Sequence, residues 1–432
     1  MEPTQQDTGL LLAGAFAYAN GVQVSPGILR WHNGEFRSIG CGVGWDCSAY
    51  INQGGIPPTY GLAEWNGSVY IGGEWNFTRD GETFNYIMRW DGQQWHPLGQ
   101  GLDNKVTSIR VIDDQLIVAG WFQYADTVLA NGLARWDGER WHRVLDVPQF
   151  SPGDNNYVND VAFYEGLWYL GGNLLNLGDF VRWTGTVWEP VGGGLYGTFS
   201  SVQKLNIHDG RLYVSGTFSA CPPYGVPTNP GSGIVAWDGE NWDDLGGGTC
   251  GAGVPDVMGV TWWNDDLYVS GRFSMIGGVP TGKLARWDGE QWCSLLPPGF
   301  FSTGGANTLV VYNDSLYVGG AFLEEGPPSL SCFAKWVGDD QTFGCGTYVG
   351  VGERETPLGW AVYPNPAHDL VQMGEPPRGT TSFRIVDALG RTMLERVVQR
   401  SLQVTGLAPG SYVVLALGAS GAVLGRTRMV VE

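Results

Sequence analysis

Apolar and polar positions alternate in short runs along most of the chain. Val106 to Ile112 alternates, Asp113-Asp114 interrupts the run, and Leu116 to Phe122 resumes it. A polar loop follows, then Leu133 to Trp136, an Asp-Gly pair, and Arg140 to Leu145. Alternation with a period of two, bounded by turn residues, is typical of half-buried strands. This segment therefore predicts four antiparallel strands joined by short turns.

The same pattern recurs along residues 1–351. Each copy has an apolar strand that ends in small residues, of the form LYVGG, and a later turn of the form RWDGxxW. The turns are anchored at Trp31, Trp90, Trp136, Trp183, Trp237, Trp287 and Trp336, which lie 46 to 59 residues apart. A period near 50 residues with strand-turn chemistry in each unit predicts a β-propeller. We expect an all-β fold with seven four-stranded antiparallel blades.

Local turn chemistry supports this prediction. Asn-Gly and Asp-Gly pairs permit the positive φ angles of type I′ hairpins, which we expect at Asn33-Gly34, Asp91-Gly92, Asp238-Gly239 and Asp288-Gly289. The small residues at the end of the LYVGG strand allow large neighbours to approach. We expect those neighbours to be the aromatic residues of the RWDG strand.

The double glycine, the later tryptophan and the period together resemble kelch-type propellers. The Trp-Asp pair is also similar to WD repeats, although the Gly-His half of that signature is absent. The resemblance covers about residues 10–350 and concerns architecture, so it implies no activity.

Closure of the predicted ring has two alternatives. The first repeat begins at its second strand, because Asp7-Thr8-Gly9 resembles the turn that follows an inner strand. The missing strand is either Met1 to Gln6 or Thr347 to Val351, and we favour the second.

Composition narrows the classes of function. The chain has 24 Lys plus Arg against 43 Asp plus Glu, a net charge of −19, which disfavours binding to nucleic acids and anionic membranes. No apolar run is long enough for a transmembrane segment. The apolar stretch Leu10 to Ala19 follows an acidic segment without Lys or Arg, so we expect a strand there and no N-terminal signal peptide in this chain. We expect the protein to use no cofactor and to be a monomer.

The cysteines predict three local disulfides on one face of the propeller. The expected pairs are Cys41 with Cys47, Cys221 with Cys250, and Cys332 with Cys345, which leaves Cys293 unpaired. No cysteine or histidine spacing indicates a metal site.

The long loops open on that same face and supply the candidate ligand-binding residues. They are Trp45, Tyr50, Tyr60, Phe150 and Tyr224. The first hypothesis is a non-catalytic module that binds a glycan or a protein partner through these aromatics. The alternative is an exported carbohydrate-active hydrolase or lyase using acids such as Asp46, Asp154 or Asp256. A third is a structural surface protein. We assign no catalytic residue, because no histidine has a serine or cysteine partner in the repeat phase.

The repeat stops after Val351. Residues 352–358 read as a linker, and residues 359–432 as short strands of a small β-sandwich. The string VYPNPAHD, the segment FRIVDALGR and the segment LAPGSYVV resemble the type A C-terminal sorting domain of the type IX secretion system of Bacteroidota. The motif residues are Tyr363, Pro364, Asn365, Pro366, Asp387, Gly390, Arg391, Gly410 and Tyr412. The resemblance implies an Ig-like sandwich, export by the type IX machinery, cleavage by its sortase, and a secreted or surface-attached product.

Overall fold

The computed structural model describes residues 9–16, 18–19, 22–44, 58–147, 156–174, 177–197, 200–221, 225–249, 255–301, 304–323, 331–337, 342–346, 362–363, 366–374, 376–386, 392–419 and 423–431. These residues form strands and turns without a helix, which confirms the predicted all-β class. The chain forms two compact units, Met1–Val349 and Gly350–Glu432.

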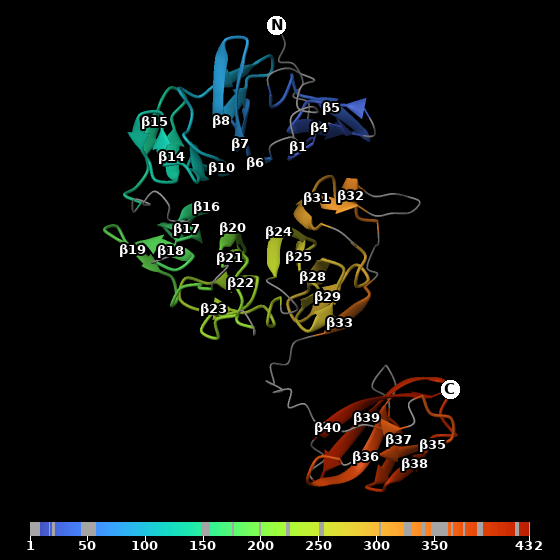
Figure 1. Ribbon diagram of the computed structural model, residues 1–432. Coiled ribbons are helices and arrows are strands. Elements are labelled where there is room, and N and C mark those ends of the chain that lie inside the picture. The colour runs from blue at the N-terminus through green and yellow to red at the C-terminus, as the bar shows by residue number, and fades with distance from the viewer. Residues whose placement is uncertain are drawn as a thin grey trace. The chain divides into compact units, whose positions relative to one another are not determined.

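The first unit is a succession of antiparallel sheets, each built from one stretch of chain and arranged around a common centre (Figure 1). Sheet 1 contains β1 (Leu10–Ala13), β4 (Ile28–His32) and β5 (Glu35–Ser38). Sheet 2 contains β6 (Thr59–Trp65), β7 (Ser68–Arg79), β8 (Glu82–Trp90) and β9 (Trp95–Pro97). Sheet 3 contains β10 (Val106–Ile112), β11 (Gln115–Gly120), β14 (Leu133–Trp136) and β15 (Trp141–Arg143). Sheet 4 contains β16 (Tyr157–Tyr164), β17 (Leu167–Asn173), β18 (Phe180–Trp183) and β19 (Trp188–Pro190).

The remaining sheets follow the same order, with one exception at the end. Sheet 5 contains β20 (Val202–His208), β21 (Arg211–Gly216), β22 (Ile234–Trp237) and β23 (Trp242–Asp243). Sheet 6 contains β24 (Asp256–Trp263), β25 (Asp266–Arg272), β28 (Leu284–Trp287), β29 (Trp292–Ser294) and β33 (Gly344–Gly346). Sheet 7 contains β30 (Ala306–Val311), β31 (Leu316–Leu323) and β32 (Ser331–Lys335). Three ribbons pair β2 (Tyr18–Ala19) with β3 (Val22–Gln23), β12 (Tyr124–Ala125) with β13 (Val128–Leu129), and β26 (Met275–Ile276) with β27 (Val279–Pro280).

Neighbouring sheets pack mainly through their inner strands, β6 against β10 and β16 against β20 for example. Sheets 7 and 1 meet through aromatic rings. The ring of Phe333 on β32 lies 5.9 Å from that of Trp31 and 6.0 Å from that of Phe36. Both segments predicted to supply a closing strand, Met1 to Gln6 and Thr347 to Val351, lie outside the described residues.

The double glycines fit against the next sheet and against their own inner strand. A Cβ atom added at Gly72 would lie 2.5 Å from the Val106 side chain, and one at Gly171 would lie 2.3 Å from that of Val202. A Cβ atom added at the second glycine of a pair, such as Gly172, would lie 2.0 Å from the backbone carbonyl oxygen of Tyr157. The expected aromatic neighbours from the RWDG strand are therefore wrong, because aliphatic side chains and the backbone fill this space at Gly72, Gly171 and Gly172.

The predicted type I′ turn is present at Asn33-Gly34, where φ is 49° and 87°. At Asp91-Gly92 only the glycine has a positive φ, and the strands close at Trp90 and Trp95 across a four-residue loop. The Asp91 carboxylate accepts hydrogen bonds from the backbone amides of Gln93 and Gln94, both at 2.8 Å. Equivalent bonds occur at Asp137, Asp238 and Asp288. The type I′ prediction is therefore wrong at Asp91-Gly92, Asp238-Gly239 and Asp288-Gly289, since the aspartate side chain stabilises a longer loop there.

A tryptophan on the outer strand links five successive sheets to the sheet before. Each indole N–H donates to a carbonyl just after the preceding outer strand: Trp95 to Ile39, Trp141 to Leu98, Trp188 to Asp146, Trp242 to Gly192 and Trp292 to Leu245, at 2.5 to 3.3 Å. The repeated tryptophans are thus inter-sheet contacts with a defined hydrogen bond.

The last repeat departs from this scheme. Val337 stands where four of the other repeats have the turn aspartate, and Gln341 stands where all of the other repeats have the outer-strand aromatic. Without those stabilising groups, β33 pairs with β29 of sheet 6, and the described part of sheet 7 has no outer strand. Cys345 forms a disulfide with Cys293, whereas Cys332 is free and exposed. The predicted Cys332–Cys345 pair and the unpaired Cys293 are therefore wrong.

The second unit is a two-sheet sandwich with its own core. One sheet contains β34 (Val362–Tyr363), β35 (Leu370–Met373) and β38 (Ser401–Gln403), and the other contains β37 (Thr392–Val397), β36 (Thr380–Val386), β39 (Gly410–Gly418) and β40 (Val423–Val431). Val371, Phe383, Ile385, Val414 and Met429 are buried between them. Alternation of apolar residues on strands such as β36 supplies this core.

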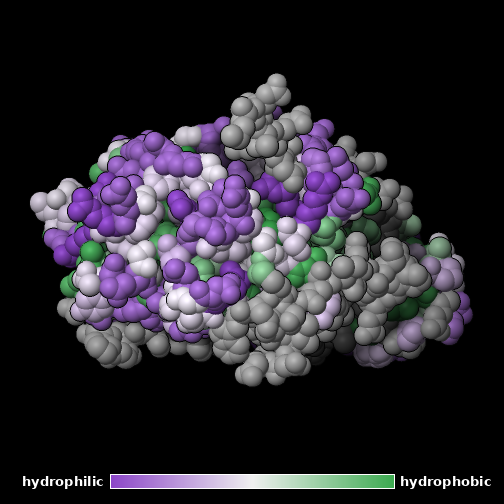
Figure 2. Space-filling view, turned by 90° about the horizontal axis from the view of Figure 1, so that it is seen from above, coloured by the Kyte–Doolittle hydropathy of each residue, from purple (hydrophilic) through white to green (hydrophobic). Residues whose placement is uncertain are grey.

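The surface seen in Figure 2 is mainly hydrophilic, with hydrophobic residues in small separate patches. Single exposed apolar side chains, such as Val187 and Ile207, are ordinary for a protein surface. Among the residues that the structure describes, no helix is long and apolar enough to cross a membrane.

Candidate functional site

The inner strand of each sheet begins, and the LYVGG strand ends, on the loop-bearing face. The register places these points together, with Thr59 opposite Gly73, Val106 opposite Gly120, Val158 opposite Gly172, Val202 opposite Gly216 and Val257 opposite Gly271. The residue after the second glycine is Glu74, Trp121, Asn173, Thr217 or Arg272 in sheets 2 to 6. We call these residues and their neighbours at the starts of the inner strands the mouth positions. Their chemistry differs from sheet to sheet although their backbone setting is the same.

Sheets 2 and 3 form a charged and aromatic cluster at the mouth positions. The Tyr60 hydroxyl donates to the Glu74 carboxylate at 3.3 Å, and the Lys105 ammonium lies 3.3 Å from the same carboxylate oxygen. The Lys105 ammonium also lies 3.6 Å from the centre of the Trp121 ring, a cation–π contact. A carboxylate, an ammonium, a phenol and an indole therefore meet across two sheets.

Sheet 4 continues this row. The Tyr157 ring stacks on Trp121 with centres 4.0 Å apart and planes 14° apart. Because the Tyr157 ring covers one face of the indole, the Lys105 ammonium, 3.6 Å from the ring centre, lies over the other face. The Trp121 N–H donates to Asn159 at 3.4 Å, and the Asn159 amide donates to the Ser201 hydroxyl in the next segment at 2.9 Å. We call Tyr60, Glu74, Lys105, Trp121, Tyr157 and Asn159 the mouth row.

The mouth row combines exposure with a defined geometry. Tyr60 and Trp121 are 45% and 38% exposed, although Tyr60 is hydrogen-bonded to Glu74 and Trp121 has polar and aromatic partners. Burial of part of the ring and the nearby Glu74 carboxylate raise the pKa of Tyr60 to about 12, so its hydroxyl keeps its proton. The row can therefore offer a hydroxyl group, a carboxylate, an ammonium and aromatic edges to one ligand.

Sheet 6 carries a second charged pair at the mouth positions. The Arg272 guanidinium donates to the buried Asp256 carboxylate at 2.7 Å, while most of the Arg272 side chain is exposed. Burial raises the pKa of Asp256 above its ordinary value, although Arg272 opposes that shift. A Cβ atom at Gly305 would lie 2.8 Å from Cγ of Arg272, so the glycine leaves room for this side chain.

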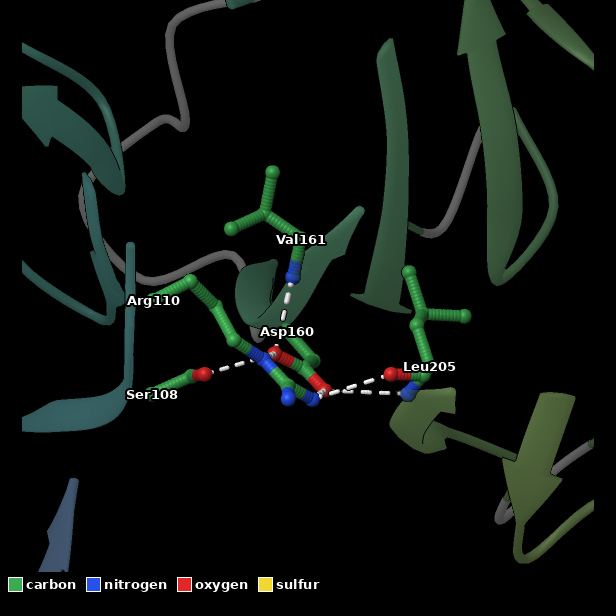
Figure 3. A network of polar contacts seen from close by, with 5 residues as sticks. All are labelled: Ser108, Arg110, Asp160, Val161 and Leu205. Atoms are coloured by element: carbon green, nitrogen blue, oxygen red, sulfur yellow. Dashed lines mark hydrogen bonds and ion pairs between the residues drawn. The ribbon is translucent and has the colours of Figure 1, made fainter. Parts of the chain in front are cut away.

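The interior behind the mouth row holds an ion pair that joins sheets 3, 4 and 5 (Figure 3). The fully buried Asp160 carboxylate accepts from the Ser108 hydroxyl at 2.6 Å, from Nε of Arg110 at 3.0 Å, and from the backbone amides of Val161 at 3.0 Å and Leu205 at 2.9 Å. Burial alone would raise the pKa of Asp160, but the Arg110 guanidinium, the Lys204 ammonium and the Ser108 hydroxyl together outweigh burial and hold that pKa below its ordinary value. All of these partners of the Asp160 carboxylate are groups of the protein itself. The network therefore holds the strands of sheets 3, 4 and 5 in position.

Of the five aromatic residues predicted from sequence, Tyr60 belongs to the mouth row. Trp45, Tyr50, Phe150 and Tyr224 lie outside the described residues, as do the candidate acids Asp46 and Asp154. Sequence reasoning missed Glu74, Lys105, Trp121, Tyr157 and Asn159. One signal was available, because the residue after the double glycine changes chemical type between otherwise similar repeats.

Part of the predicted sorting motif can be located in the second unit. Tyr363 ends β34 and is 51% exposed, and Pro366 follows it. Gly410 begins β39, and the buried Tyr412 donates its hydroxyl to the Ala408 carbonyl at 2.7 Å. Pro364, Asn365, Asp387, Gly390 and Arg391 lie outside the described residues.

The other cysteines give an incomplete comparison with the predicted pairs. Cys41 and Cys221 are both disulfide-bonded. Their predicted partners, Cys47 and Cys250, lie outside the described residues. Within the described parts of the chain, no group of three His, Cys, Asp or Glu side chains could hold a metal ion.

Comparison with known proteins bears on the second unit. Residues 361–428 match the family described as secretion system C-terminal sorting domain. This match confirms the predicted type IX sorting domain and supports a secreted or cell-surface location. No curated protein matches the chain in sequence.

Solved structures similar to the chain are distant. PorZ, an essential bacterial surface component of the type IX secretion system of Porphyromonas gingivalis, is 13% identical, with a TM-score of 0.37 over 94% of this chain and 63% of that chain. The chain thus spans less than two thirds of PorZ. The computationally designed Ika8 protein is 13% identical, with a TM-score of 0.38 over 86% of this chain and 96% of that chain. The extracellular domain assigned to a hybrid two-component system of B. thetaiotaomicron is 10% identical, with a TM-score of 0.36 over 94% and 67%.

Proposed function

We propose that the first unit is a seven-bladed, kelch-like β-propeller that acts as a non-catalytic binding module for an exported protein. The mouth row is its binding site, and the ligand is a glycan or a protein partner. The observation that carries this proposal is the row itself, in which exposed Tyr60 and Trp121 flank the Glu74–Lys105 ion pair. Exposed aromatics with a few convergent polar groups are characteristic of ligand sites.

A saccharide suits this set of groups. Sugar hydroxyl groups both donate and accept hydrogen bonds, so they can pair with the Glu74 carboxylate, the Lys105 ammonium and the Tyr60 hydroxyl at once. The apolar face of a sugar ring can pack on the Tyr60 ring, while Trp121 provides an apolar edge beside it. The ion pair and stacking already fix these side chains, which limits the entropy that binding would cost.

The test compares two stacked tryptophans at opposite ends of the inner strands. Trp121 stacks on Tyr157 at the mouth, and Trp262 stacks on His208 next to the β24–β25 hairpin, with ring centres 4.2 Å apart and planes 14° apart. The full chain is applied to a glycan array and to a pull-down from the surface proteins of the producing cells. Trp121→Ala should weaken any binding about tenfold or more, and Trp262→Ala should leave it unchanged. Equal binding by wild type and Trp121→Ala would contradict the proposal.

A second proposal, an exported carbohydrate-active hydrolase or lyase, has one observation in its favour. Burial raises the pKa of the Asp256 carboxyl at the mouth, which is a property of proton donors in glycosidases. Arg272 is already bound to this carboxylate, however. The test uses a polysaccharide that the wild type binds. If the wild type releases reducing sugar from it and Asp256→Asn does not, that result would favour the enzyme over the binding module.

A further inference from the structure

Sheet 6 has a lysine where the equivalent position of three other sheets has a glycine. The residue just before the third strand of sheets 1, 3 and 5 is Gly27, Gly132 or Gly233, with φ of 78°, 85° and 72°. In sheet 6 this residue is Lys283, and its φ is also 72°. In all four sheets its carbonyl accepts a backbone hydrogen bond from a glycine at or next to the end of the neighbouring strand, at 2.9 to 3.4 Å. The four positions are therefore structurally equivalent.

A side chain is unfavourable at this position. In the left-handed region Cβ of an L-residue comes too close to the backbone, which is why glycine is favoured there. The glycines of the other three sheets show that the local fold needs no side chain here. A strained residue of this kind is a reason to seek a role for its side chain.

The Lys283 ammonium lies beside a second cationic side chain at the mouth positions. It donates to the Gly304 carbonyl at 2.6 Å. The Arg272 side chain passes the next residue, since a Cβ atom at Gly305 would lie 2.8 Å from Cγ of Arg272. The backbones are also joined, because the Gly271 amide donates to the Lys283 carbonyl. Both cations therefore lie along one short segment, Gly304–Gly305.

One carboxylate serves these two cations. Arg272 donates to the buried Asp256 carboxylate at 2.7 Å, and 63% of the Arg272 side chain remains exposed. Within the described parts of the chain, no carboxylate forms an ion pair with Lys283. Burial lowers the pKa of the Lys283 ammonium below its ordinary value. The pair of cations thus has one positive charge in excess and donors directed to solvent.

We propose that Lys283 and Arg272 bind one carboxylate group of an acidic saccharide. This inference rests on the proposed function, in which the mouth positions bind a glycan. Ammonium and guanidinium groups donate charge-assisted hydrogen bonds to carboxylate oxygens, and one excess positive charge matches one carboxylate. The net charge of −19 repels a polyanion, so the favoured ligand has uronic acid residues isolated among neutral sugars.

The experiment compares ligands that differ in one group. The full chain is applied to an array of oligosaccharides that contain a single glucuronic acid, and to the same oligosaccharides with that carboxyl group reduced to an alcohol. The wild type should bind the acidic form about tenfold or more tightly, because the charge-assisted hydrogen bonds are lost in the reduced form. Equal binding of the two forms would overturn the proposal.

Two variants test whether Lys283 carries this preference. Lys283→Gln should bind the acidic form no more tightly than the reduced form. Lys335→Gln is the matched control, since it removes an exposed lysine from β32, and it should keep the full preference. A preference that survives in Lys283→Gln would assign it to another group.

A third variant separates binding from a structural role. Lys283→Gly removes both the ammonium and the strained side chain, so it should lose the preference and yet unfold about 1–2 °C above Lys283→Gln. If Lys283→Gly instead unfolds below the wild type, the bond to the Gly304 carbonyl stabilises the fold, and the strain is explained without a ligand. Thermal unfolding followed by circular dichroism measures this difference.

The same array distinguishes this inference from the proposed function. Trp121→Ala should weaken binding of the acidic and the reduced forms alike, whereas Lys283→Gln should weaken only the acidic form. Binding that depends on Trp121 without a preference for the acid would remove the carboxylate site and leave the mouth row. Capture of a protein with no glycan bound would overturn this inference and leave the protein alternative of the proposed function.

Discussion

At the outer rim, sheets 2 to 6 place a tryptophan at one position and use it for one hydrogen bond to the preceding sheet. At the mouth, the same sheets place five different residues at one position, namely Glu74, Trp121, Asn173, Thr217 and Arg272. Packing between sheets explains the uniform position. The varied position has the same backbone setting in each sheet, so packing does not dictate its chemistry. This contrast separates scaffold from candidate site within a single repeat.

The largest expected effect comes from breaking the rim. Trp292→Ala removes a fully buried side chain and its hydrogen bond to the Leu245 carbonyl, and should lower the free energy of unfolding by about 3–5 kcal/mol. Trp292→Phe keeps most of the ring but leaves the carbonyl without its donor, so it should cost about 1–3 kcal/mol. Urea unfolding followed by tryptophan fluorescence and circular dichroism measures both. A cost below about 1 kcal/mol for the alanine variant would mean that the rim is not a packing device.

Breaking the buried ion pair should have a similar effect, reached by another route. Asp160→Ala leaves the Arg110 guanidinium without its charged partner and should cost about 3–5 kcal/mol. The exposed pair Arg211–Asp243 is the matched control, and Asp243→Ala should change stability by less than about 1 kcal/mol. The pKa of Asp160 is held below its ordinary value, so its contribution is present at neutral pH. That contribution is lost as pH falls through the lowered pKa. Equal costs for the two variants would contradict the assigned roles.

Asp179 should affect stability with the opposite dependence on pH. Burial raises its pKa to about 6, while the Ser200 hydroxyl and the Leu174 amide oppose the shift. Because the folded pKa exceeds the unfolded one, its stabilising contribution is present at low pH and is lost as pH rises through about 6. Asp179→Asn should therefore raise the unfolding free energy by about 3 kcal/mol at pH 8 and have little effect at pH 4. Thermal unfolding of both proteins across this range tests the sign, and a variant that is less stable at pH 8 would contradict it.

The mouth should be the least sensitive region in stability. Trp121→Ala removes a partly exposed ring and its contacts with Tyr157 and Lys105, at a cost of about 1 kcal/mol. Ligand binding by Trp121→Ala should nevertheless fall. The expected effect of this variant is thus mainly on binding, whereas the expected effect of the Trp292 variants is on stability. Differential scanning calorimetry of the two alanine variants sharpens the comparison. A loss of stability as large as that of Trp292→Ala would place Trp121 with the scaffold.

Much of the first unit could be predicted from residue patterns. The alternating runs and the Asn33-Gly34 turn identified strands and hairpins, because both depend on local backbone preferences. The Asp-Gly pairs misled, since the Asp91 side chain stabilises a four-residue loop that the dipeptide alone does not reveal. Alternation also cannot say which sheet edge receives the three residues of β33, so the partner of Cys345 was wrong.

The candidate site was less predictable than the fold. Loop length drew attention to Tyr60 but not to Lys105 or Trp121, which lie at the ends of regular strands. Their meeting depends on how the inner strands of neighbouring sheets pack against each other, which is long-range information. The sorting domain was identified because its motifs are local in sequence, and the family match at residues 361–428 confirms it.

The Cys293–Cys345 bond also changes what a protease could achieve. The disulfide closes a covalent loop that contains β30, β31 and β32, because it joins the two ends of that stretch at one point on sheet 6. A single backbone cut inside this loop would yield two fragments that stay joined by the Cys293–Cys345 disulfide. An exported protein built in this way can be nicked at its last sheet and still remain one molecule.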